Sequence, residues 1–292
     1  MGQTIACANQ KGGVGKTTTV VNLAAYLALA GDRVLVVDLD PQGNATSGFG
    51  IERAGLETTL YDVILGDTPV RDVIRPTAVA DCSIVPASVS LAGADVELAA
   101  VEQRERRLAR ALRGVTEDYD YVLVDCPPSL GLLTVNALTA ADSVLIPTQC
   151  EYYALEGLSQ LIATLNLVRD SLNPALEIKG VVLTMYDART NLSADVAAEV
   201  RGHLGDAVFE TIVPRSVRLS EAPSFGLPIA LYRADSRGAL AYAELARELR
   251  RRDGRPMPEG ASTGRASTGR ATPATSVVHE QILEAAPVGA HP

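Results

Sequence analysis

A glycine-rich turn near the beginning of the chain limits its possible folds more than any other segment. The turn lies between a short apolar stretch, residues 5–8, and a helical pattern over residues 17–30. Strand, glycine-rich turn and helix, in that order, are the local structure of a phosphate-binding loop. Glycines let the backbone curl so that its N–H groups face an anion, and the helix N-terminus adds unpaired N–H donors. The expected nucleotide ligands in the turn are Gln10, Lys11, Gly12, Gly13, Val14, Gly15, Lys16, Thr17 and Thr18.

Two lysines stand in this turn. Lys16 is placed to reach the β- and γ-phosphates of a nucleotide, and the Thr17 hydroxyl to ligate Mg²⁺. Lys11 precedes the glycines, and Gln10 stands where the general pattern has a glycine. Of 26 basic residues, only Lys11, Lys16 and Lys179 are lysines. A planar guanidinium cannot replace a compact ammonium on a crowded phosphate, so we interpret both lysines of the turn as functional.

Apolar runs alternate with helical patterns along most of the chain. The predicted strands are 5–8, 34–37, 83–85, 121–124, 143–146, 180–185 and 207–213. The predicted helices are 17–30, 95–114, 131–140, 153–171, 192–204 and 239–252. Most strands are continuously apolar, which is typical of strands buried on both faces of a parallel sheet. The pattern predicts an α/β fold, a doubly wound and mostly parallel sheet flanked by helices.

The composition changes after the last predicted helix. Residues 260–274 contain the sequence Ala-Ser-Thr-Gly-Arg twice and almost nothing apolar. Such a segment cannot bury enough surface to offset its ordering entropy. We therefore expect one domain over 1–253 and a disordered tail over 254–292.

Carboxylates follow two of the predicted strands. Asp38 and Asp40 come after strand 34–37, and alternation along an extended segment places them on one side. One can hold Mg²⁺ or its waters, and the other can orient a water for attack on the γ-phosphate. Asp125 ends strand 121–124 and is expected to contact Mg²⁺ through water. The alternative for Asp38 and Asp40 is a simple turn, because Asp-Pro and Gly-Asn are turn sequences.

Composition excludes several classes of function. The formal net charge of −9 argues against attraction of the whole surface to nucleic acid, so any DNA binding must come from a local basic patch. No apolar run approaches the ~20 residues of a membrane span, and no signal peptide is expected before the loop. Cys7, Cys82, Cys126 and Cys150 show no Cys-x-x-Cys spacing and are expected to be small buried residues in a reducing cytosol.

Taken together, the motifs closely resemble the ParA/Soj family of chromosome- and plasmid-partitioning ATPases. The similar stretches are KGGVGKTTT (11–19), VDLDPQGNATSG (37–48), DCPPSLG (125–131), PTQCEYYALEGL (147–158), LTMYDART (183–190) and PRSVRLSEAPSFG (214–226). They run in order through residues 2 to about 250. The extra lysine is typical of the deviant loop of the ParA/MinD group, and the later stretches resemble its partition branch.

The resemblance implies roles for the matched residues. Lys11 is similar to the signature lysine that crosses a nucleotide-sandwich dimer to the partner's phosphates. Asp40 resembles the residue that positions the hydrolytic water, so the expected catalytic residues are Lys11, Lys16 and Asp40. Asp125 resembles the acid of the Mg²⁺ site, and the expected metal ligands are Thr17, Asp38 and Asp125. The expected contacts to adenine are Met185, Pro214, Arg215, Ser216 and Val217.

The same resemblance implies a function. It predicts a cytoplasmic ATPase with weak intrinsic activity that uses ATP and Mg²⁺, dimerises in the ATP state and then associates with the nucleoid. A ParB-like partner protein would stimulate hydrolysis and release the DNA, and no membrane partner is expected. Arg189 and Arg218 match arginines used for DNA binding that does not depend on sequence.

Arginines are frequent in the later part of the chain and offer the required basic patch. Arg189, Arg215, Arg218, Arg233 and Arg237 follow the later strands, and Arg247 and Arg250 to Arg252 end the last helix. If they gather on one face, an acidic protein acquires a stripe that binds phosphates. The alternative is that these arginines are solvated or paired with carboxylates, and for 250–252 that they suit a helix C-terminus.

Three other functions are alternatives to DNA partitioning. A MinD-like membrane protein needs a C-terminal amphipathic helix with cations, but the candidate, 277–286, carries Glu280 and Glu284 and no Lys or Arg. A redox ATPase similar to the nitrogenase iron protein needs cysteines at a dimer axis, and Cys126 is directly beside Asp125 rather than further along the loop. A related ATPase that positions another cargo keeps the same fold.

Overall fold

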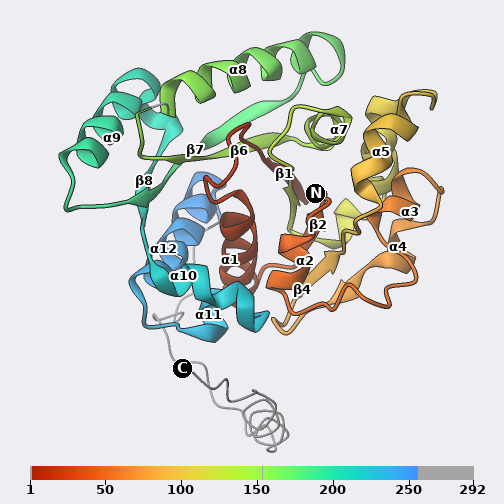
Figure 1. The fold of residues 1–292 in the computed structure, drawn as a ribbon, viewed down its shortest axis with the longest axis horizontal. Helices are drawn as coiled ribbons and strands as arrows, with labels where there is room; N and C mark the ends of the chain where they lie inside the picture. Colours follow the sequence, from red (N-terminus) through yellow and green to blue (C-terminus); the bar gives the residue numbers. More distant parts are fainter. Residues whose placement is uncertain (1, 153, 256–292) are drawn as a thin grey trace, which may run out of the picture. The chain divides into compact units, whose positions relative to one another are not determined.

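A computed structural model describes residues 2–152 and 154–255 of the 292 residues (Figure 1). The expected tail, 254–292, lies outside the described residues except for Gly254 and Arg255. The strands are β1 (Gln3–Cys7), β2 (Val34–Asp38), β3 (Arg75–Pro76), β4 (Cys82–Val85), β5 (Tyr121–Asp125), β6 (Ser143–Gln149), β7 (Glu177–Tyr186) and β8 (Val208–Pro214). All seven predicted strands are present, and the two-residue β3 is additional.

The helices alternate with these strands. The longer ones are α1 (Lys16–Leu29), α5 (Leu91–Leu98), α7 (Leu132–Ala140), α8 (Ala154–Ser171), α9 (Asn191–Leu204) and α12 (Arg237–Arg252). The shorter ones are α2 (Asn44–Gly48), α3 (Leu60–Ile64), α4 (Val70–Val73), α6 (Arg107–Leu112), α10 (Val217–Glu221) and α11 (Ile229–Tyr232). Single 3₁₀ turns are η1 (Arg104–Arg106), η2 (Thr116–Asp118), η3 (Gly205–Ala207) and η4 (Ala222–Phe225).

The strands form one eight-stranded sheet in the order β3-β4-β2-β5-β1-β6-β7-β8. Every neighbouring pair is parallel except β3 and β4, which are antiparallel. From β1 the chain first builds the β2 side of the sheet and later the β6 side. Ligands of doubly wound sheets bind where the strand order reverses in this way, at the carboxyl ends of the strands. The prediction of a doubly wound, mostly parallel sheet is confirmed, and the glycine-rich turn follows the strand at the reversal.

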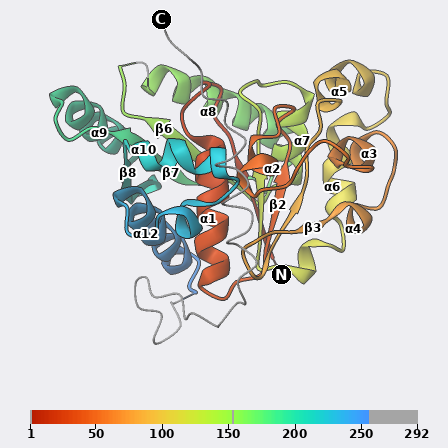
Figure 2. The ribbon, with the colours of Figure 1, turned by 60° about the horizontal axis from the view of Figure 1, so that its bottom comes forward.

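Helices cover both faces of the sheet, as Figures 1 and 2 show. Val34 and Val36 of β2 enter the core that contains α1 and α12, whereas Leu35 and Val37 enter the core on the other face. All residues of β2 and β5 are buried. Because each of these strands is covered on both faces, its sequence is continuously apolar rather than alternating.

The last helix also protects the edge of the sheet. β8 is the edge strand beyond β7, and its N–H groups at Glu210 and Thr211 donate to the carboxylate of Glu248 on α12, at 2.8 and 2.9 Å. The Thr211 hydroxyl donates to the same carboxylate at 2.7 Å. These bonds occupy N–H groups that a further strand would use, so α12 both fills a core and covers part of the edge.

The predicted helix over 95–114 is wrong, because the structure divides it into α5, η1 and α6. Asn136 of α7 is fully buried and causes part of the break. Its amide donates to the carbonyl of Arg104 at 2.8 Å, and its carbonyl accepts from the N–H of Leu108 at 3.1 Å. These backbone groups are thus satisfied by a side chain from another helix. Gln103 between the pieces has φ of 53°, which no continuous right-handed helix contains.

Candidate nucleotide and metal site

The glycine-rich turn has the backbone that its glycines predict. Gly13 and Gly15 have φ of 74° and 89°, in the left-handed region where side chains are unfavourable. Gly15 directly precedes α1 and has no side chain to cap it, so the first N–H groups of the helix are left for a ligand. Lys16 is buried, and its ammonium donates to the carbonyl of Lys11 at 3.3 Å across the turn.

Two polar side chains hold the turn against the sheet. Asn9 donates to the carbonyl of Pro147 at 2.8 Å and accepts from the N–H of Lys11 at 3.0 Å. Thr184 of β7 donates to the carbonyl of Val14 at 2.8 Å. The turn is therefore fixed to the ends of β6 and β7 before any ligand arrives. Asn9 and Thr184 were missed by sequence reasoning, because their partners lie far away along the chain.

Lys11 differs from Lys16 in its surroundings. Its ammonium pairs with Glu151 at 2.9 Å, and 39% of the Lys11 side chain is exposed. An exposed ion pair of this kind contributes about 0–1 kcal/mol to stability and exchanges easily for another anion. Lys11 is therefore held by its own chain through a partly exposed ion pair. Glu151 was not singled out from the sequence.

The two predicted metal carboxylates lie opposite each other. Asp38 and Asp125 end β2 and β5 in direct register, and both are fully buried. Burial raises the pKa of Asp38 to about 6, although hydrogen bonds from Thr46 and the Asp40 N–H lower it. Burial, and then the Asp38 carboxylate, raise the pKa of Asp125 well above its usual range, while Thr17 and Lys16 oppose this.

Asp125 is the residue whose surroundings best fit a bound cation. The Thr17 hydroxyl lies near enough to lower the pKa of Asp125, but neither carboxylate oxygen has a hydrogen bond of good geometry among the described residues. A buried carboxylate without such bonds is costly, whereas oxygen ligands of this kind suit Mg²⁺. The residues present therefore fit the expected metal, with Asp125 and Thr17 beside the phosphate-binding turn. Within the same described residues, no group of three or more His, Cys, Asp or Glu side chains is arranged to hold a metal ion.

Asp40 lies at the start of the loop between β2 and α2 and is buried. One of its carboxylate oxygens accepts from the N–H of Gln42 at 2.9 Å, and its carbonyl accepts from the N–H of Gly43 at 2.8 Å. The backbone N–H of Asp40 donates to Oδ1 of Asp38 at 3.3 Å. This is the turn that the alternative interpretation expected, and the catalytic role of Asp40 stays a prediction.

The expected adenine contacts gather near the ends of β7 and β8. Met185 has φ of 51°, unusual for a residue with a side chain. Its terminal methyl would lie 4.0 Å from a Cβ placed on Gly15, so Met185 borders the phosphate-binding turn. The Arg215 N–H donates to the carbonyl of Tyr186 at 2.9 Å, which joins the segment after β8 to the end of β7. Pro214 ends β8, Ser216 precedes α10 and Val217 is exposed.

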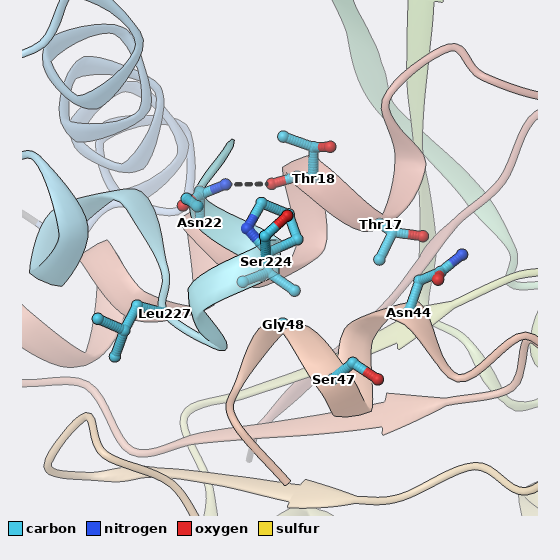
Figure 3. Close-up of a pocket in the computed structure, with 11 residues that line it drawn as sticks. Thr17, Thr18, Asn22, Asn44, Ser47, Gly48, Ser224 and Leu227 are labelled. Atoms are coloured by element: carbon cyan, nitrogen blue, oxygen red, sulfur yellow. Dashed lines mark hydrogen bonds between the residues drawn. The ribbon is translucent and has the colours of Figure 1, made fainter. Parts of the chain in front are cut away.

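A pocket of about 410 Å³ opens beside the start of α1. Figure 3 shows Thr17 and Thr18 on one side of it, Asn44, Ser47 and Gly48 of α2 on another, and Ser224 and Leu227 closing it. Its lining is uncharged: Thr17, Thr18, Val21, Asn22, Asn44, Ser47, Gly48, Ala222, Pro223, Ser224 and Leu227. Because Thr17 and Thr18 are expected ligands, the pocket adjoins the expected nucleotide site.

The two expected DNA arginines already have carboxylate partners. Arg189 is highly exposed and forms two hydrogen bonds with Asp187, at 2.8 and 2.6 Å. These bonds lower the pKa of Asp187 below its usual range. Arg218 on α10 pairs with Glu221 at 2.7 Å and is half exposed. β7 and β8 are parallel, and each arginine follows the carboxyl end of one of them. Both arginines are therefore on the side of the sheet where the strands end, which is also the side of the glycine-rich turn.

The single arginine stripe considered from the sequence is wrong for the run at the end of α12. Arg250 is buried and pairs with Asp32. Arg252 donates to the carbonyl of Val208, where β8 begins, and lies 4.0 Å from the centre of the Phe209 ring. The end of α12 therefore lies at the amino ends of the strands, whereas Arg189 and Arg218 follow their carboxyl ends. The four cysteines are free and buried, as expected.

Within the described residues, no helix is long and apolar enough to cross a membrane. The segment 277–286, considered as a membrane helix, lies outside the described residues.

Comparisons with known proteins place this geometry in a family. A family model described as an AAA domain matches residues 2–178. Sporulation initiation inhibitor protein Soj of Bacillus subtilis (strain 168) is 59% identical over 249 residues, which cover 85% of this chain and 98% of that protein. Chromosome partitioning protein ParA of Myxococcus xanthus (strain DK1622) is 56% identical over 253 residues, covering 87% of this chain and 89% of that protein.

A solved structure has the same fold. Cobyrinic acid a,c-diamide synthase from Mycobacterium smegmatis, crystallised with ADP and magnesium, superposes with a TM-score of 0.76 at 40% identity. The superposition covers 88% of this chain and 98% of that one. The glycine-rich turn with its second lysine, the carboxylates after β2 and β5, and the close relatives agree. The chain belongs to the ParA/Soj family of chromosome-partitioning ATPases.

Proposed function

We propose that this protein is an ATP-driven DNA-partitioning switch. ATP with Mg²⁺ brings two copies together face to face, and the dimer binds DNA through its phosphates without regard to sequence. A ParB-like partner stimulates hydrolysis, after which the dimer separates and leaves the DNA. The observation that carries the proposal is the contrast between buried Lys16 and exposed Lys11 on one turn.

The chain's own residues divide the work of hydrolysis. The N–H groups after Gly15 and the Lys16 ammonium hold the phosphates, and Thr17 and Asp125 are the ligands that fit Mg²⁺. Mg²⁺ supplies neutralisation of the charge on the transferred phosphoryl group. Asp40 orients the attacking water, which its buried position at the end of β2 supports. Hydrolysis is slow in one subunit because Lys11 must come from the other.

Lys11 links nucleotide binding to dimerisation by exchanging the Glu151 carboxylate for a phosphate of the other subunit's nucleotide. In the single chain, the Lys11 ammonium rests on Glu151 at 2.9 Å. A phosphate of a nucleotide held by a second subunit offers more negative charge than one carboxylate, so it competes well for this ammonium. The expected location is the cytoplasm, with nucleoid association while ATP is bound. This rests on the DNA binding proposed for Arg189 and Arg218.

Changing Asp40 to alanine tests the proposal. Asp40→Ala leaves the phosphate-binding turn intact, so we expect it to bind ATP, to persist as a dimer by light scattering and to lose hydrolysis by about 100-fold or more. Asp235→Ala, an exposed carboxylate after α11, is the matched control and should hydrolyse ATP at the wild-type rate. An Asp40→Ala variant with full hydrolysis would refute the role given to Asp40.

A further inference from the structure

Thr46 occupies an unusual place in the loop that carries Asp40. It is fully buried in the short helix α2, and it is part of neither the phosphate-binding turn nor the expected metal ligands. Its N–H and its hydroxyl both donate to the same oxygen of Asp38, Oδ2, at 2.7 and 2.6 Å. Asp38 and Thr46 are eight positions apart, so these two bonds close the segment between them into a ring.

The direction of these hydrogen bonds is fixed by a third residue. The N–H of Ala87, which follows β4, donates to the Thr46 hydroxyl oxygen at 3.0 Å. A backbone N–H can only donate, so this hydroxyl must accept from Ala87 and direct its own hydrogen to Asp38. Thr46 therefore joins the ends of β2 and β4 through one hydroxyl group. All three residues are fully buried, which excludes water as a substitute partner.

The ring encloses the residue expected to position the hydrolytic water. Asp40 lies within it, and its N–H points to the other carboxylate oxygen of Asp38, Oδ1, at 3.3 Å. With Oδ2 of Asp38 taken by Thr46, only Oδ1 remains available towards the site. The facing Asp125 carboxylate has no hydrogen bond of good geometry among the described residues. One of the two opposed carboxylates is thus fixed by donors and the other is left for the cation.

We propose that Thr46 is a positioning residue for ATP hydrolysis: it closes the loop that carries Asp40 and fixes the orientation of Asp38. The inference rests on the role proposed above for Asp40 in hydrolysis and on Asp38 as an expected ligand of the metal. Thr46 acts on the site only through Asp38 and is not itself an expected ligand of the nucleotide or the metal. Its loss should therefore slow the chemical step and spare nucleotide binding, because a displaced catalytic group can cost about 100-fold in rate.

Kinetics of ATP hydrolysis by the full chain test this inference. Thr46→Val keeps the shape of the side chain and removes the hydroxyl, so we expect kcat to fall about 10- to 100-fold while KM for ATP changes less than about threefold. Thr46→Ser keeps the hydroxyl and should restore kcat to within about threefold of wild type. Thr139→Val, which removes a buried hydroxyl bonded to its own helix at Val135, is the control and should match wild type.

A double-mutant cycle shows whether Thr46 acts through Asp38. Adding Thr46→Val to Asp38→Ala should slow hydrolysis less than about threefold further, because the shared interaction is already lost. If Thr46→Val does not fold, Thr46→Cys replaces it in the assay. A thiol forms weaker hydrogen bonds than a hydroxyl, so Thr46→Cys should lower kcat more than Thr46→Ser does and less than Asp38→Ala does.

Two results overturn the inference. The first is a kcat within about threefold of wild type for Thr46→Val, or for Thr46→Cys if that variant is used instead. The second is a fall in nucleotide affinity that matches the fall in kcat, because a positioning residue should affect the chemical step alone.

The outcome is separable from that of the proposed function. Lys16→Ala sets the background of the assay, because it removes the ammonium of the phosphate-binding turn. If Lys16→Ala hydrolyses ATP as fast as wild type, the proposed function fails. If Lys16→Ala is inactive and Thr46→Val is fully active, only the role of Thr46 fails.

Discussion

Lys11 and Lys16 lie on one turn, yet their surroundings separate their roles. Lys16 is buried, and its ammonium bridges the turn to the Lys11 carbonyl, so it already points into the space that phosphates would fill. Lys11 extends outward to Glu151 and remains 39% exposed. A buried cation can serve only its own site, whereas an exposed one can serve a second molecule. Burial thus distinguishes two lysines that the sequence pattern groups together.

Substitution of each lysine should have a different effect. Lys16→Ala removes a charge from the phosphate-binding turn, so we expect no detectable binding of a fluorescent ATP analogue. Lys11→Ala leaves that turn intact, so it should bind the analogue within about threefold of wild type and stay monomeric with ATP. Light scattering of both variants with and without ATP separates the two results. A Lys11→Ala variant that dimerises with ATP as wild type does would contradict the account.

Side chains that tie distant segments together were the hardest to foresee. The turn, its two lysines and the carboxylates at Asp38, Asp40 and Asp125 follow from local patterns, because each comes directly after a strand. Thr46 and Thr184 offered no such signal. Each acts on a residue placed beside it only by the fold, and a buried threonine has no distinctive sequence pattern. Their roles depend on which strands become neighbours, which local patterns do not specify.

Among the secondary-structure elements, apolar runs predicted strands more reliably than helical patterns predicted helices. All seven predicted strands are present because burial on both faces of the sheet leaves a continuous apolar run. The helix expected over 95–114 fails because Asn136 satisfies backbone groups at Arg104 and Leu108 from outside. Helices α2, α10 and α11 were not predicted, since segments of four or five residues show no full helical period.

The hydrogen bonds between Glu248 of α12 and the edge strand β8 should make the stability of the fold depend on pH. Burial opposes ionisation of Glu248, but hydrogen bonds from Thr211 and the Glu210 N–H, together with Arg252, lower the pKa of Glu248 below its usual value. The carboxylate therefore stabilises the fold above the unfolded-state value of 4.5, and this stability is lost as pH falls through the lower folded value. At pH 7, Glu248→Gln should lower the free energy of unfolding by roughly 2 kcal/mol.

Urea denaturation at several pH values measures this contribution. The difference in unfolding free energy between wild type and Glu248→Gln should stay constant from neutral pH down to about 5 and shrink below it. Glu244→Gln is the control, because Glu244 lies on the same helix in exposed pairs with Arg247 and Arg251. It should change stability by less than about 1 kcal/mol. A Glu248 effect that grows as pH falls would contradict the assigned role.

Close contact between two glycines joins the residue after η4 to the segment that follows α2. A Cβ on Gly226, after η4, would meet the Cα of Gly50, after α2, at 2.8 Å, and Gly226 has φ of 62°. Gly226→Ala should therefore destabilise the fold by roughly 2–3 kcal/mol, through both backbone strain and the clash. Gly31→Ala, just after α1, has the φ penalty alone, since its φ is 91° and nothing lies within 4 Å of its Cβ position. Equal losses of stability for the two variants in denaturation would show that the contact is not tight.

Across the described part of the molecule, the two arginines expected to bind DNA lie apart from the arginines that end α12. The net charge is −9, so DNA binding requires a local cationic surface. Arg189 and Arg218 follow the carboxyl ends of the strands, as the glycine-rich turn does. The arginines that end α12 lie at the amino ends of the strands. Arg250 is buried on Asp32 and serves the fold. The DNA-binding surface proposed for Arg189 and Arg218 would lie beside the proposed nucleotide site, where it is well placed to respond to the nucleotide's state.

DNA binding in different nucleotide states distinguishes an ATP-driven switch from a protein that binds DNA at all times. The measurement is retention of the full chain on a DNA duplex with ATP, with ADP and without nucleotide, at a stated salt concentration. The measurement is repeated for the double variant Arg189→Glu with Arg218→Glu. The control is Arg113→Glu with Arg251→Glu, which changes the charge equally at two exposed arginines away from the glycine-rich turn. We predict retention with ATP only, a loss of about tenfold or more in affinity for the first pair and little change for the control. Retention that is independent of nucleotide, or unaffected by changing Arg189 and Arg218, would contradict the account.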